Sequence, residues 1–206
     1  MLFRVDISVH SELNAAFLRG GARGHEQLER ELAADYQRFQ ATEPLRFNLA
    51  YAEGFEALTT AMAVIFARED HSKWNPVALD VSTWHLLEEL EHRTVAFEVY
   101  DHVVGSYAYR VRVGAYAQRH LLRFMNRTME ALLAADPRTE AEFGGRAGRK
   151  AREPRLFKLL ARKLLPRVLR TYSPLYSPRD IAMPASFERS IAEYTARGAR
   201  RSREAS

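Results

Sequence analysis

The segment 84–100 constrains the fold most, because it places two imidazoles and three carboxylates within nine residues and then continues as a largely apolar run. In a helix of 3.6 residues per turn, positions three, four and seven apart lie on one face. Four of the five side chains therefore point the same way and one points elsewhere. The four are His85, Glu88, Glu89 and His92, and the fifth is Glu91.

The step from Glu89 to His92 favours a metal centre. A Glu-x-x-His spacing on the inward face of a helix is typical of two-metal sites in helical bundles. A solvated helix face is the common alternative for such a charged group. Leucines and aromatic residues flank this one on both sides, so we expect it to be partly buried. Buried carboxylates need a partner or a metal, and we expect a metal to bind within this cluster.

A second helix, predicted from Pro44 to about Arg68, carries two further candidate acids. Proline suits the first turn of a helix. Glu53 and Glu56 stand three residues apart among apolar and small residues, where carboxylates are costly to bury unless they are paired or metal-bound. The small residues predict the close approach of another helix, and we expect this partner to be the helix that carries Glu89.

The length of 206 residues and a hydrophobic content of 47% fit one all-α domain with a real core. Further helices are expected over 1–18, 25–40, 76–104, 107–134, 154–170 and 185–197. We expect residues 1–135 to form the metal-binding helical bundle. Residues 136–206 are expected to form a basic helical extension that is packed on the bundle or tethered to it.

The composition limits the chemistry. The chain has no cysteine, which excludes disulfides, thiolate ligands and a cysteine nucleophile. A metal would therefore be held by His, Asp and Glu, which suits iron, manganese or zinc. No uninterrupted apolar run of membrane-spanning length and no signal peptide appears, so we expect a cytoplasmic protein.

The segment 146–170 is strongly basic, with ten Lys or Arg and a single acid. Within it, residues 155–170 alternate apolar pairs with cations, which is typical of an interfacial helix that makes peripheral membrane contact. A terminal helix that packs its leucines on the bundle gives the same pattern, and we favour this second interpretation. No motif that reads nucleic acid is present, so no nucleic-acid partner is expected. Formation of a homo-oligomer is left open.

The run 84–100 resembles the signature of the bacterial predicted metal-dependent hydrolases, and weaker similarity extends from about Phe3 to Pro178. The resemblance implies a ferritin-like up-down helical bundle with additional C-terminal helices. It places a metal-ligating carboxylate at Glu56. Family members also carry an earlier helix with a ligating Glu, so the resemblance implies a chain truncated at its N-terminus.

The resemblance also implies a Glu-x-x-His step in the first helix of this chain. Its histidine matches His10, but Ile7 stands at the position of the Glu. Asn14 stands where the family has a further histidine. Two positions of the ligand set that the resemblance implies are therefore changed in this chain.

The sequence predicts a metal-dependent hydrolase that acts on a small-molecule substrate. The expected metal ligands are Glu56, Glu89, His92 and His10. We expect Glu88 and His85 to orient these ligands or to carry protons, and the metal to lower the pKa of water.

Two alternatives remain. A carboxylate-bridged di-iron site would instead activate dioxygen. The changes at Ile7 and Asn14 favour a third interpretation, a degenerate, non-catalytic protein that acts as a helical interaction module or at a membrane surface.

Overall fold

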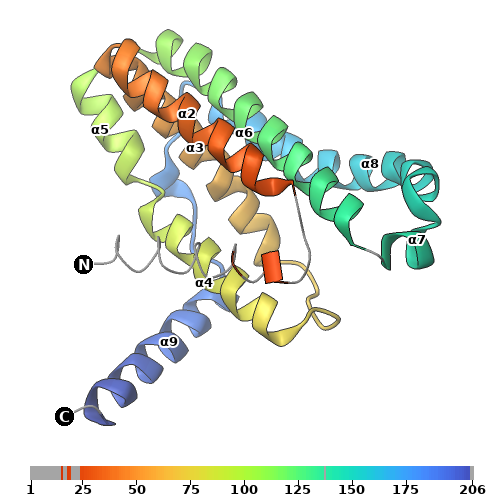
Figure 1. Cartoon of the computed structure of the whole chain (residues 1–206). Helices are drawn as coiled ribbons and strands as arrows, with labels where there is room; N and C mark the ends of the chain where they lie inside the picture. Colours follow the sequence, from red (N-terminus) through yellow and green to blue (C-terminus); the bar gives the residue numbers. More distant parts are fainter. Residues whose placement is uncertain (1–14, 16–17, 20–23, 137, 205–206) are drawn as a thin grey trace.

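The computed structural model describes residues 15, 18–19, 24–136 and 138–204 (Figure 1). The described elements are helices, with no strand among these residues, which confirms the all-α prediction. Most of the expected first helix, including His10, lies outside the described residues. The helices are α2 (His25–Thr42), α3 (Leu45–Phe66), α4 (Pro76–His92), α5 (Val95–Val103), α6 (Tyr107–Ala135), α7 (Arg138–Phe143), α8 (Gly145–Thr171) and α9 (Ala185–Glu204), with a short 3₁₀ helix at Pro178–Asp180.

Helix α3 is the centre of the bundle, in contact with α2, α4, α5, α6 and α8. Among the described helices, α3 is the one whose length and mean hydropathy of 1.3 would also allow it to cross a membrane. In the fold, however, 56% of that apolar window is buried inside the protein. The position of α3 among five other helices is that of a core helix, as the sequence predicted.

Two glycines allow α3 and α6 to approach closely. A Cβ added at Gly54 would lie 2.4 Å from the Cα of Gly114. No side chain fits into that space, so the contact requires glycine at position 54. The small residues of α3 were predicted to permit such a contact, but the expected partner was the helix of Glu89. The closest approach is to α6 instead, and α4 packs on a different side of α3.

The buried apolar residues form two clusters, one toward each end of α3. The first joins α2, α3, α5 and α6 and includes Phe39, Tyr51, Tyr100 and Val113. The second joins α3, α4 and α9 through Val64, Leu87, Leu90 and Phe187. The α3–α4 pairing that positions the candidate site is therefore held on the α9 side by buried apolar contacts.

Two predicted helices differ from the structure. The helix expected over 76–104 is divided into α4 and α5 by a turn at Arg93 and Thr94, where the β-branched pair Thr94 and Val95 has low helix propensity. The helix expected to begin at Pro154 begins earlier, at Gly145, after Gly144 with φ 66°. Residues 145–153 contain Ala, Arg, Lys and Glu, which favour helix strongly enough to extend it upstream.

The C-terminal helices pack on the bundle, α8 against α3 and α9 against α4. In the part of α8 whose side chains are described, Leu165 and Leu169 are 52% and 57% exposed. Lys163 forms an ion pair with Glu69, 2.5 Å from Nζ to Oε1. Membrane contact through residues 155–170 stays a prediction.

Candidate metal centre

The central feature of the site is a pair of carboxyl groups, Glu56 on α3 and Glu89 on α4, which interact directly. Burial, together with the negative charge of Glu89, raises the pKa of Glu56 to about 8. The Oε2 atom of Glu56 is buried and has no hydrogen-bond partner among the described residues. Two carboxylates in this arrangement must share a proton or a cation, because like charges in contact disfavour full ionisation.

Thr59 fixes the orientation of Glu89. It lies one turn after Glu56 on α3, and its hydroxyl donates a hydrogen bond to Glu89 Oε2 over 2.8 Å. This contact crosses from α3 to α4 and leaves the other oxygen of Glu89 available. Thr59 was missed by the sequence analysis, although its spacing of three from Glu56 placed it on the same face of the helix.

His85 lies beside the pair. It is one turn before Glu89 on α4, and its Nε2 is 3.7 Å from Glu89 Oε1. Its side chain is 35% exposed, so it reaches solvent as well as the carboxylate. Glu88, the other residue expected to orient ligands or carry protons, is buried on α4 at 9% exposure.

Of the other two predicted ligands, the structure describes one. His92 is the last residue of α4 and is half-buried. His10 lies outside the described residues. Among the residues that the structure describes, no three His, Asp or Glu side chains converge closely enough to hold a metal ion. The donor set therefore fits a metal cation only in part. Glu56 and Glu89 supply two hard carboxylate ligands, and a complete metal site needs further ligands.

Glu53 turns away from this pair. It is 3% exposed, and its Oε1 accepts a hydrogen bond from Arg110 Nη1 of α6 over 3.1 Å. Burial raises the pKa of Glu53, and the positive charge of Arg110 opposes that rise. Arg110 also donates to the carbonyl of Thr171 over 3.0 Å. Glu53 thus belongs to an ion pair that joins α3, α6 and the end of α8, and not to the metal site.

A separate hydrogen-bonded chain crosses the α2 side of the bundle. Asp35 Oδ2 lies 3.1 Å from His120 Nε2, and His120 Nδ1 lies 2.7 Å from the hydroxyl of Tyr51. Burial raises the pKa of the Tyr51 phenol, so it stays a hydrogen-bond donor at neutral pH. The described contacts of His120 are therefore with Tyr51 and Asp35.

Two basic side chains of the bundle are buried. Arg110 of α6 is 6% exposed. His25, the first residue of α2, is 2% exposed. A Cβ at the preceding Gly24 would lie 3.7 Å from the Cβ of Ala131, which shows that α2 begins against α6. The spacing of residues along one helix does not reveal which residues of other helices will cover a side chain.

Comparison with known proteins agrees with the resemblance that the signature indicated. No curated protein and no solved structure matches the chain. A family model described as "predicted metal-dependent hydrolase" matches residues 7–182, which include α2 to α8 and therefore Glu56, Glu89 and their surroundings. On that match, the chain belongs to the family of predicted metal-dependent hydrolases.

Proposed function

We propose that this protein is a hydrolase whose divalent metal is held by Glu56 and Glu89 between α3 and α4. The observation that carries the proposal is the contact between these two carboxyl groups, with one buried oxygen of Glu56 lacking a partner. A divalent cation would satisfy both charges and that oxygen at once. Oxygen and imidazole donors suit iron, manganese or zinc.

The remaining ligands are proposed from the sequence and the family. His92, at the end of α4, and His10 are the candidates for the imidazole donors. Mixed carboxylate and imidazole sets of this kind are typical of metal sites between helices in bundles. Thr59 supports the site by holding Glu89 in a fixed orientation.

A bound divalent metal acts as a Lewis acid on a substrate and lowers the pKa of water. In hydrolysis, water oxygen bonds to the electrophilic carbon of the substrate, the bond to the leaving group breaks, and a proton passes from water to that group. We propose that His85 takes and releases this proton; its position beside Glu89 and its partial exposure support this role. Glu88 is proposed as the second proton-carrying group.

The test is metal-dependent hydrolysis of a panel of small esters and amides. We expect the protein to turn over at least one of them, to lose the activity in chelator and to regain it with manganese, iron or zinc. Glu89→Gln should abolish the activity. Glu91→Gln, an exposed acid on the same helix, is the matched control and should retain it. Activity that survives both chelator and Glu89→Gln would refute the proposal.

A further inference from the structure

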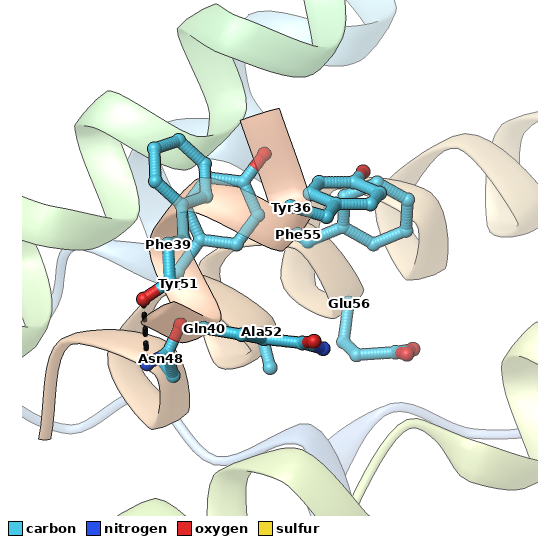
Figure 2. Close-up of a pocket in the computed structure, with 8 residues that line it drawn as sticks. All are labelled: Tyr36, Phe39, Gln40, Asn48, Tyr51, Ala52, Phe55 and Glu56. Atoms are coloured by element: carbon cyan, nitrogen blue, oxygen red, sulfur yellow. Dashed lines mark hydrogen bonds between the residues drawn. The ribbon is translucent and has the colours of Figure 1, made fainter. Parts of the chain in front are cut away.

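A groove between α2 and α3 leads to the α3 member of the carboxylate pair. It has a volume of about 320 Å³ and is lined by both helices (Figure 2). Helix α2 contributes Tyr36, Phe39 and Gln40, and α3 contributes residues from Asn48 to Glu56 at helical spacing. Its size is near the lower end of the range for small-molecule pockets. Because Glu56 lines the groove, a molecule bound in it would lie next to the proposed metal centre.

The wall of the groove is built from aromatic rings that hold one another in place. The ring centroids of Phe39 and Tyr51 are 5.1 Å apart, and those of Tyr36 and Tyr51 are 5.9 Å apart. Phe39 is 3% exposed, so it is fixed in the core as well as lining the groove. This wall is formed before any ligand binds, and it offers apolar ring surface.

The polar ends of these rings are directed elsewhere. In Figure 2 the hydroxyls of Tyr36 and Tyr51 point away from Glu56. The Tyr51 hydroxyl is 2.7 Å from His120, which in turn contacts Asp35. The hydroxyl of Tyr51 is thus engaged in the hydrogen-bonded chain on the α2 side, and its ring lines the groove.

The charges around the groove exclude an anionic ligand. Apart from the phenols, Glu56 is the ionisable group among the described residues that line it. The amide of Asn48 is neutral and already donates to the carbonyls of Phe39 and Glu43, each over 3.3 Å. With no Lys or Arg among the described lining residues, a phosphate or carboxylate would find no cationic partner in the groove and would lie near the acid of Glu56.

We propose that this groove binds the apolar, acyl or aryl part of a small neutral substrate whose polar reacting group lies at Glu56. The proposal rests on the proposed function, because it takes the carboxylate pair as the reacting end. The packed aromatic wall binds the apolar part, and the described lining residues offer no Lys or Arg to an anion. The substrate class is therefore a neutral ester or amide with an apolar substituent, and not a phosphorylated or acidic compound.

The test measures binding without turnover, using the neutral fluorophore N-phenyl-1-naphthylamine and the full chain, as purified and after chelation. Ala52→Trp places an indole in the groove from an exposed position one turn before Glu56. We expect it to weaken probe binding by at least about tenfold. Ala108→Trp, at an exposed position on α6 outside the groove, should leave binding unchanged. Circular dichroism checks that both variants are folded, and Phe55→Ala, which removes part of the wall, should also weaken binding.

The competitors decide the chemistry of the ligand. In the chelated protein, neutral phenyl acetamide should displace the probe, whereas benzoate should not. Equal binding by Ala52→Trp and the unchanged protein, or stronger displacement by benzoate than by phenyl acetamide, would overturn the inference. Probe binding does not require a metal. A protein that binds the probe at this groove but never binds metal would refute the proposed function and leave the groove as a binding site for neutral apolar molecules.

Discussion

The hydroxyl of Thr59 on α3 donates a hydrogen bond to Oε2 of Glu89 on α4 over 2.8 Å, and this contact holds one carboxylate of the pair toward the other. Groups that orient a ligand usually change metal affinity when they are lost. The neighbouring Thr60 offers a matched comparison, because its buried hydroxyl has no hydrogen-bond partner among the described residues.

Thr59→Val should weaken metal binding by about 10- to 100-fold, because it removes the group that orients Glu89. Thr60→Val removes a hydroxyl of the same kind that orients nothing, and it should leave metal affinity unchanged. Titration calorimetry with manganese or zinc measures both variants. Equal affinities for the two would show that the Thr59 contact has no role at the site.

The metal-free protein should lose stability as the pH rises. Burial and the charge of Glu89 raise the pKa of Glu56 from 4.5 to about 8, so the folded protein holds a proton there that the unfolded chain releases. Its stabilising contribution is complete below pH 4.5 and is lost as the pH rises through about 8. Glu56→Gln removes this dependence. We expect the Tm in chelator to fall by several degrees between pH 5 and pH 9, on the order of 2–4 °C per kcal/mol, and to fall less in Glu56→Gln.

The control for this dependence is Glu91→Gln, which changes an exposed acid on α4. It should follow the curve of the unchanged protein. Added manganese should raise the Tm of the unchanged protein most at high pH, where the carboxylates are ionised, and should not raise that of Glu56→Gln. The same curve for Glu56→Gln and the unchanged protein would mean that Glu56 does not face Glu89 in solution.

The two glycines at the α3–α6 contact should respond differently to alanine. Gly54→Ala places a Cβ 2.4 Å from the Cα of Gly114, so backbone must move, at a cost of about 1–3 kcal/mol. At Gly114 the nearest atom to an added Cβ is 3.6 Å away, an ordinary contact. Gly114→Ala should therefore be tolerated, or stabilise by up to about 1 kcal/mol through helix propensity. Urea denaturation compares them, and a larger loss for Gly114→Ala would contradict the packing described.

The buried ion pair should be costly to break from one side. Arg110→Met leaves Glu53 buried without its partner, which we expect to cost about 3–5 kcal/mol of the free energy of unfolding. Adding Glu53→Gln to that variant should restore part of the loss. Arg112→Met, at an exposed position two residues further along α6, should have little effect. Chemical denaturation of the unchanged protein, Arg110→Met, Glu53→Gln and the double variant gives the coupling energy, and additive losses would show that the two residues are independent.

Much of the helical framework could be predicted from periodicity and from proline and glycine positions. The expected spans of α2, α3 and α6 agree closely with the structure. The division between α4 and α5 was missed, because a weak helical point at Thr94 and Val95 does not by itself end a helix. The early start of α8 was missed because Pro154 suggested a helix start.

The site could be predicted only in part. The meeting of Glu56 with Glu89 was anticipated from spacing, burial and family resemblance. The different partner of Glu53 was not anticipated. Residues three apart are offset by about 60° around a helix axis, so they can contact different neighbouring helices. Glu56 meets α4, whereas Glu53 meets Arg110 of α6. Which neighbour stands on which side is a property of the packed bundle and not of one helix.

The most direct test of the account is the metal content of the full chain, purified without chelator and measured by elemental analysis. The account predicts iron, manganese or zinc in stoichiometric amount, and its loss in a folded Glu56→Gln, Glu89→Gln double variant. The Glu91→Gln protein, prepared in parallel, should keep its metal. The same metal content in the double variant, or no metal and no uptake on addition to the unchanged protein, would contradict a metal centre at this carboxylate pair.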